Sequence, residues 1–260
     1  MFSAVPLALD RAKKAIGVAA GIVSAVRAGL RGKNAPVYLD VGSRGGLPAR
    51  WRPVASAGLI VPVYVEPDLT EAAQLAARFP KARLIRSALG SMDNAVATLR
   101  LTREPGRSSL LEPNPDVIAG FADTQPWDVL DRQPLTVRRL DCIWGDNPAP
   151  EFLKVDVQGY ELEVLKGMGA LLDEVICLEA EVSLCRFYEQ QATFEEVREF
   201  LFANGFDLVR MAAMGLYRGQ AMIEFNTFWV RRSFHDDPRT RLWKKVNDIG
   251  NPRRVNVWGH

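Results

Sequence analysis

The residues best placed to do chemistry lie in the segment Lys154-Val155-Asp156-Val157-Gln158-Gly159-Tyr160-Glu161. An apolar run brings a lysine and an aspartate to the end of a predicted strand, and a glycine then turns the chain into a helix. Such strand-to-helix turns form the ligand-facing rim of open α/β sheets. A second turn of this type lies upstream, at Tyr38-Leu39-Asp40-Val41-Gly42-Ser43-Arg44-Gly45-Gly46. Two acidic strand ends on one rim predict a single cleft that binds a small molecule.

The upstream turn contains the glycines that a closely bound ligand requires. Gly42 and Gly46 allow the backbone to approach a ligand at the start of a helix. Glu66 ends the next predicted strand, where an acid typically binds ribose hydroxyls. The dinucleotide pattern Gly-x-Gly-x-x-Gly is absent from residues 42–46, which disfavours an NAD oxidoreductase. The pattern Asp-x-Gly-x-x-x-Gly is closer to a turn for S-adenosylmethionine, whose cationic groups favour nearby carboxylates.

In these segments the chain resembles the FkbM-type S-adenosylmethionine-dependent methyltransferase family, over about residues 36–232. The specific part of the likeness is the Lys-x-Asp-x-x-Gly-x-Glu segment at 154–161. The chain departs from the family pattern at Ser43-Arg44, where an Asn after a small residue is usual, and at Cys142, where a second acid often follows Leu-Asp. The other matching segments are Leu39-Asp40-Val41-Gly42, Glu66-Pro67, Ser87-Ala88-Leu89-Gly90, Ser108-Ser109-Leu110, Leu140-Asp141 and Val164-Leu165-Lys166-Gly167.

The resemblance implies a set of site residues. The cofactor is expected to contact Asp40, Gly42, Ser43, Gly46, Glu66, Pro67, Ser87, Ala88 and Asp156. The candidate catalytic residues are Asp156, beside the expected methyl position, and Glu181, at the end of the next strand. Glu179 and Glu181 share one side of that strand by alternation, so one of them is a candidate for binding the acceptor or a Mg²⁺ ion. No histidine or cysteine metal site is expected.

Several of these residues have a structural alternative. Asp156 would serve equally as a partner of Lys154 or of the helix start, and Glu161 is expected to stabilise that helix start through its dipole. Ser109 is as compatible with a turn as with a ligand contact. Two loops are expected over the cleft, with Phe121, Trp127, Tyr217 and Arg218 as candidates for lining the acceptor site or for anchoring the loops.

The elements that must position these residues alternate between strand and helix. Seven strands are predicted, at 37–41, 59–66, 82–86, 152–157, 175–180, 206–211 and 224–231, with short extra strands at 95–101 and 135–140 and an irregular stretch at 104–133. Helices are predicted at 47–57, 68–79, 161–172 and 193–203. This order predicts an α/β, Rossmann-like class I methyltransferase fold. Its seven-stranded sheet is expected to be mainly parallel, with helices on both faces and an antiparallel last strand.

Charge divides the chain into three parts. Residues 1–34 carry six Lys or Arg against one Asp, and residues 231–260 carry eight against three Asp, although the net charge is +2. We expect an amphipathic helical extension at 1–34, the methyltransferase domain at 35–232 with an insertion at 103–135 over the cleft, and a basic extension at 233–260. His235 should lie at the rim opposite the cleft.

The composition of the chain limits the cellular compartment and the classes of partner that we expect. The three cysteines form no framework and fit a reducing compartment, and no apolar run is long enough to cross a membrane, so a cytoplasmic protein is expected. Peripheral membrane contact through the N-terminal helix and homo-oligomer formation stay open, and no nucleic-acid partner is expected. The predicted activity is methylation of a hydroxyl on a sugar, glycan or natural product. The alternative is a non-catalytic binding or scaffold protein, suggested by Arg44 beside a cationic cofactor.

Overall fold

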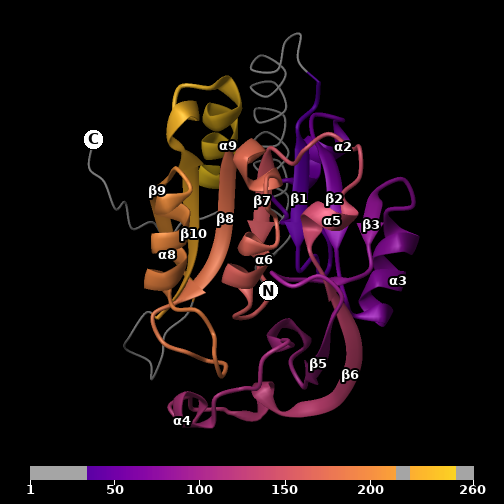
Figure 1. Cartoon of the computed structure of the whole chain (residues 1–260), viewed down its shortest axis with the longest axis vertical. Helices are drawn as coiled ribbons and strands as arrows, with labels where there is room; N and C mark the ends of the chain where they lie inside the picture. The colour runs from indigo at the N-terminus through magenta and orange to yellow at the C-terminus, as the bar shows by residue number, and fades with distance from the viewer. Residues whose placement is uncertain (1–33, 215–222, 250–260) are drawn as a thin grey trace, which may run out of the picture.

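Seven strands form the central sheet in the part of the chain that the computed structural model describes, residues 34–214 and 223–249. Their order across the sheet is β3-β2-β1-β7-β8-β10-β9 (Figure 1). The first five pair in parallel, and β10 runs antiparallel to both β8 and β9, which confirms the predicted sheet. The strands are β1 (Val37–Val41), β2 (Val61–Val65), β3 (Arg83–Ile85), β7 (Phe152–Val155), β8 (Cys177–Ser183), β9 (Phe206–Ala213) and β10 (Glu224–Arg231).

Four helices pack on one face of this sheet. Alternate residues of the central strands, such as Leu39 and Leu153, point to this face. They form one buried cluster with apolar residues of the helices, among them Val164 and Leu201. A slip of one residue would turn the apolar set to the other face, so this cluster fixes the register of the strands. The helices are α5 (Leu140–Ile143), α6 (Glu161–Lys166), α7 (Leu171–Glu174) and α8 (Phe194–Ala203).

An aromatic cluster fills the opposite face, under α2 (Arg52–Ser56) and α9 (Pro238–Ile249). Tyr38 packs on Trp51 with ring centroids 4.9 Å apart, and Phe228 packs on Trp243 of α9 at 5.7 Å. Part of the expected basic C-terminal extension therefore contributes to the core. Helix α3 (Leu69–Arg78) contacts β3 at the end of the sheet.

A second, small sheet lies beyond the carboxyl ends of the parallel strands (Figure 1). It consists of β4 (Ala88–Leu89), β6 (Val129–Arg138) and β5 (Ala95–Thr102), with β6 in the middle. The expected extra strands at 95–101 and 135–140 are present. The irregular stretch predicted at 104–133 is partly wrong, because β6 begins at Val129 and pairs with β5 along its length. Pro134 and the charged residues before it are typical of a loop, but one long antiparallel partner overrides that local preference.

The segment between β5 and β6 is anchored to the connection between β8 and α8. The amide of Asn114 donates to the carbonyl of Phe187 at 2.8 Å. Phe121 and Trp127 pack in a satellite cluster with Phe187 and Tyr188, so the structure favours loop anchoring over acceptor lining for these two aromatics. The segment contains the short helices η1 (Pro105–Arg107), α4 (Pro115–Ile118) and η2 (Gln125–Trp127).

Two predicted helices are shorter than expected. The helix after the first glycine turn covers five residues of α2 and has Pro53 near its start, since proline is tolerated in the first turn and not in the interior. The helix predicted at 161–172 is interrupted between α6 and α7. A Cβ at Gly167 would lie 2.0 Å from the carbonyl oxygen of Gly90, so close backbone contact requires glycine there.

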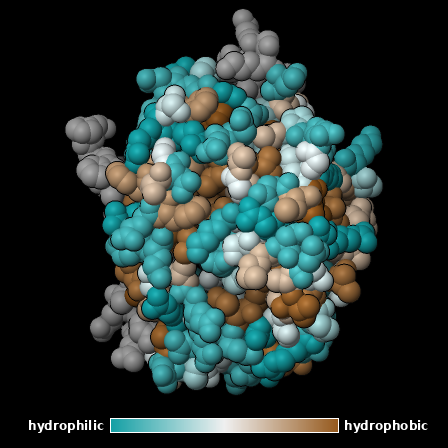
Figure 2. All heavy atoms as spheres, in the orientation of Figure 1, coloured by the Kyte–Doolittle hydropathy of each residue, from teal (hydrophilic) through white to brown (hydrophobic). Residues whose placement is uncertain are grey.

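His235 lies near the start of β9, where Nε2 is 3.0 Å from an oxygen of Asp207, which confirms its predicted place at the far rim. The predicted N-terminal helix at 1–34, Tyr217 and Arg218 fall outside the described residues. Across residues 34–214 and 223–249, no helix is both long and apolar enough to cross a membrane. Hydrophilic side chains cover most of the face shown in Figure 2, with apolar ones between them.

Candidate active site

A cavity of about 500 Å³ lies where the carboxyl ends of β1, β2 and β7 meet the small sheet. Ligand pockets of cofactor size span about 300–1,000 Å³. The structure brings the predicted cofactor residues together in its lining, with the exception of Ser43: Asp40, Gly42, Gly46, Glu66, Pro67, Ser87, Ala88 and Asp156. The two acidic strand ends therefore share one cleft.

Ser43 is buried beneath the turn and holds two strands together. Its hydroxyl donates to the carbonyl of Asp40, and its oxygen accepts the amide of Val65 at 2.9 Å. The side chain thus adds to the backbone pairing at the point where β1 and β2 end, where the amide of Gly42 donates to the carbonyl of Val65 at 3.0 Å. This polar role explains a serine at a position where the resemblance suggested a ligand contact.

The turns that follow β1 and β7 are in close backbone contact at Gly42. This residue has φ +80°, and a Cβ there would lie 1.8 Å from the carbonyl oxygen of Asp156. The amide of Asp156 donates to the carbonyl of Val41 at 3.0 Å. The glycine turn therefore sets the position of the backbone that carries Asp156.

Two buried carboxyls, Asp40 and Glu66, face the cleft from β1 and from the end of β2. Burial raises the pKa of Asp40 to about 6, and the nearby Lys154 opposes that shift. Burial raises the pKa of Glu66 to about 7, although its carboxylate accepts the amide of Asp68 at 3.0 Å. Carboxyls whose ionisation is disfavoured by burial gain most from a cation or from hydroxyl donors.

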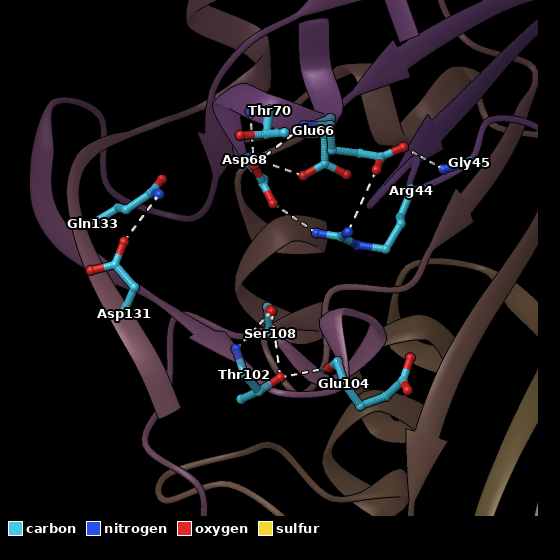
Figure 3. Close-up of polar contacts among 11 residues, drawn as sticks. Arg44, Gly45, Glu66, Asp68, Thr70, Thr102, Glu104, Ser108, Asp131 and Gln133 are labelled. Atoms are coloured by element: carbon cyan, nitrogen blue, oxygen red, sulfur yellow. Dashed lines mark hydrogen bonds and ion pairs between the residues drawn. The ribbon is translucent and has the colours of Figure 1, made fainter. Parts of the chain in front are cut away.

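Arg44, the departure from the family pattern, is neutralised by α3 (Figure 3). Its guanidinium lies 2.8 Å from Asp68 and 3.5 Å from Glu71. Glu71 also accepts the amide of Gly45 at 2.8 Å, and Asp68 caps the start of α3. These contacts tie the glycine turn to the helix. The positive charge of Arg44 is thus balanced within the protein, which removes the observation that suggested a scaffold.

A row of charged residues crosses three adjacent strands, and its members Asp40 and Lys154 line the cleft. Asp40, Lys154 and Glu179 are register neighbours on β1, β7 and β8. The Lys154 ammonium lies 2.9 Å from Asp156 and 3.7 Å from Asp40. Burial lowers the pKa of Lys154, but the carboxylates raise it more, so it stays charged. Glu179 forms a buried ion pair with Arg50 of the α2 face.

Asp156 and Glu181 form the chemically distinctive part of the site. The side-chain amide of Gln158 donates to Asp156 at 3.1 Å and to Glu181 at 2.5 Å. Burial raises the pKa of Asp156, but Lys154 and hydrogen bonds lower it more, so the net pKa is below its usual value. Burial and the Asp156 charge hold the pKa of Glu181 well above its usual value. The two neighbouring carboxyls therefore differ in proton affinity, and Glu181 is the more easily protonated of the pair.

Gln158 lies within the motif at 154–161, but the sequence alone predicted no role for it. Its position two residues after Asp156, on the turn, was the available signal. Glu161 accepts the amides of Val157 and Gly159 at 3.0 and 3.1 Å, so it braces the turn before α6. Burial raises the pKa of Glu161 to about 7.

The far wall of the cavity comes from β5 and the segment that follows it. Ser109 is tied to the rim, because its hydroxyl donates to the carbonyl of Gln158 at 2.7 Å. The side chains of this wall are apolar or hydroxyl-bearing: Leu99, Pro105, Gly106, Ser108, Ser109 and Leu110. Among the described residues, no group of three or more His, Cys, Asp or Glu has an arrangement that could hold a metal ion, so the structure gives the expected Mg²⁺ option no support.

The sequence pattern described as the methyltransferase FkbM domain matches residues 40–208, more than half of the chain. The chain belongs to the FkbM methyltransferase family. The match covers both rim turns, the small sheet and β8, and it confirms the family resemblance. The strand order and the antiparallel β10 identify the FkbM domain here as a class I methyltransferase fold.

Solved structures similar to this FkbM protein are distant. Magnesium protoporphyrin IX methyltransferase from Synechocystis PCC 6803, with bound SAM, is 16% identical, with 83% of this chain and 80% of that chain covered and a TM-score of 0.39. The 1,6-didemethyltoxoflavin-N1-methyltransferase from Burkholderia thailandensis is 17% identical, with 82% of this chain and 77% of that chain covered and a TM-score of 0.33. No curated protein matches the chain.

The residues of the cleft fit S-adenosylmethionine. One buried oxygen of Asp40 has no hydrogen-bond partner, and this carboxyl lines the cavity. Glu66 would hold the ribose hydroxyls, and the residues after β3 would lie against the base. Asp40 and Asp156 would face the cationic amino-acid end, at the turn where Gly42 brings the backbone close.

Proposed function

We propose that this FkbM protein is an S-adenosylmethionine-dependent O-methyltransferase that acts on a hydroxyl of a sugar, glycan or natural product. The observation that carries the proposal is the Asp156–Glu181 pair, which lines the cleft with the apolar and hydroxyl-bearing wall opposite. A hydroxyl acceptor must lose a proton as it is methylated, and a positioned carboxylate is a suitable base.

When bound, S-adenosylmethionine supplies a methyl group that is activated by its positive sulfonium. The protein residues then have to hold the acceptor oxygen in line with that methyl group, which is catalysis by proximity and orientation. Asp156 accepts the hydroxyl proton, because Lys154 keeps it ionised. Glu181 stays protonated and donates to Asp156 or to the acceptor.

The charges around the cavity favour an acceptor without negative charge. Asp156 lies on the rim of the cavity. Arg107 is the charged residue within the segment 105–110 of the far wall, but it stacks on Trp127, 3.9 Å from the ring centroid, and does not line the cavity. Acidic residues of the lining outnumber its cations, which are Arg44, Arg52 and Lys154, and Arg44 and Lys154 are already paired with acids of the site. An anionic acceptor would therefore meet a net negative lining. The Ser108 hydroxyl in this wall instead suits a ligand rich in hydroxyl groups.

The test is transfer of a labelled methyl group from S-adenosylmethionine to a panel of sugars, glycans and phenolic natural products. Asp156→Asn is the diagnostic variant, since it keeps the size of the side chain and removes the base. We expect turnover of a neutral hydroxyl acceptor to fall by about 10²–10⁴-fold in that variant. Turnover that is unchanged in Asp156→Asn, or a preference for amine acceptors, would contradict the proposal.

A further inference from the structure

Gln158 is held in an unusual backbone conformation at the centre of the site. Its φ is +57°, in the left-handed region that residues other than glycine rarely adopt. The flanking amides of Val157 and Gly159 are both bound to Glu161, so the turn cannot relax without breaking these bonds. A conformation of this kind persists when the surrounding contacts enforce it.

The side chain of Gln158 contacts both candidate catalytic carboxyls. Its amide nitrogen donates to Asp156 and Glu181, while its amide oxygen lies 3.1 Å from the hydroxyl of Tyr188. The opposite orientation of the amide would place its oxygen against the ionised Asp156, so the nitrogen must face the carboxyls. The amide thereby fixes the relative orientation of the two groups.

The same residue contacts the wall on the far side of the cavity. The carbonyl of Gln158 accepts the hydroxyl of Ser109 at 2.7 Å. The Tyr188 hydroxyl lies 2.9 Å from the carbonyl of Arg107, so its proton serves both that carbonyl and the amide oxygen of Gln158. Gln158 is therefore linked to the wall at residues 107 and 109 through its backbone and through its side chain.

We propose that Gln158 is a positioning residue that holds Asp156 in the orientation needed to receive the acceptor proton, keeps Glu181 beside it, and links both to the wall against which the acceptor binds. The inference rests on the proposed function. Without the amide, each carboxyl would lose the donor that fixes its rotation. The oxygen of Asp156 would then no longer be directed at the acceptor.

The decisive variant is Gln158→Met, which keeps the length of the side chain and removes its hydrogen bonds. Gln190→Met is the matched control, because Gln190 also has a positive φ, +62°, and is exposed. Both variants are titrated by NMR with ¹³C-labelled Asp and Glu carboxyls, in the presence of S-adenosylhomocysteine. Asp156→Asn and Glu181→Gln identify the two signals.

We expect the titration midpoint of Asp156 to move to higher pH in Gln158→Met and to stay at the wild-type value in Gln190→Met, since one donor to the carboxylate is lost. This readout needs no acceptor, so it is independent of whether the correct acceptor class has been found. An unchanged Asp156 titration in a folded Gln158→Met protein would overturn the inference.

With an acceptor in hand, kinetics give a second test. Gln158→Met should lower kcat by on the order of 10²-fold, with the affinity for S-adenosylhomocysteine changed little, because misplacement of a catalytic group acts on the reaction step. Wild-type kcat in the variant, or parallel losses of kcat and cofactor affinity, would show a merely structural role. If the wild type methylates no hydroxyl compound, the proposed function fails, and the carboxyl titration still decides the role of Gln158.

Discussion

Replacing Lys154 with Met should show how much one buried cation contributes to the free energy of unfolding. Methionine keeps the length of the side chain and removes the ammonium. That ammonium lies 2.9 Å from Asp156 and 3.7 Å from Asp40, and the side chain is 13% exposed. Its loss leaves two carboxyls facing each other at the cleft without a partner.

The distances set the size of the effect. At an effective dielectric constant of about 20, the two attractions are about 6 and about 4.5 kcal/mol before desolvation is subtracted. Removing one member of a buried ion pair costs about 3–5 kcal/mol in practice, and we expect Lys154→Met to fall in that range at pH 8. The loss should be smaller at pH 5, because the pKa of Asp40, already about 6, rises further and the carboxyls take up protons.

The assay is urea unfolding at pH 5 and pH 8, followed by far-ultraviolet circular dichroism. Lys166→Met is the matched control, because Lys166 pairs with Glu163 at 2.7 Å on the surface and is 43% exposed. That control should change the free energy of unfolding by about 0–1 kcal/mol. Adding Asp40→Asn to Lys154→Met should restore part of the stability. Equal costs for Lys154→Met and Lys166→Met at pH 8 would refute the reasoning.

Three further predictions concern the glycine turn and its acids. Gly42→Ala should lower the free energy of unfolding by more than about 4 kcal/mol or prevent folding. Gly45→Ala, with φ +72° and no atom within 4 Å of the new Cβ, should lower it by about 1–2 kcal/mol, measured by thermal unfolding. Similar losses in the two variants would contradict the contact between Gly42 and Asp156. Because the folded-state pKa of Glu66 is about 7 and its ordinary value 4.5, the folded protein holds the extra proton, so wild-type stability should fall as pH rises from 5 to 8. In Glu66→Gln, the decrease in unfolding free energy between pH 5 and pH 8 should be smaller by on the order of 3 kcal/mol. If the urea midpoints of the wild type and Glu66→Gln shifted equally between these pH values, the prediction would be wrong. Arg44→Gln should raise the pKa of Glu66 further, measured by carboxyl NMR, since Arg44 lowers it in the wild type; an unchanged value would show that the two groups are not coupled.

The central sheet could be predicted because its strands are apolar runs that end in an acid or a glycine. Asp40, Glu66 and Asp156 all lie where alternation and strand ends place them. The small sheet was only partly predictable, since β6 contains Asp131, Arg132 and Pro134 and its pairing depends on a distant partner. Long-range pairing of this kind leaves little local signal.

Side-chain partners were the least predictable part of the site. The sequence places Arg44 beside the cofactor turn, but its partners lie on α3, at Asp68 and Glu71, and only the fold brings them together. The contribution of α9 to the core was also missed. Basic residues dominate that segment, and they obscure the helical spacing of Leu242, Trp243 and Val246, which are all buried.

The most direct test is isothermal titration calorimetry of the folded wild-type protein with S-adenosylmethionine and S-adenosylhomocysteine, beside the Glu66→Ala variant. We predict saturable binding of both compounds by the wild type and binding at least about tenfold weaker in Glu66→Ala, as expected when a buried acid that binds ribose hydroxyls is lost. Absence of binding to the folded wild type, or equal binding by Glu66→Ala, would contradict the assignment of this cleft as the cofactor site.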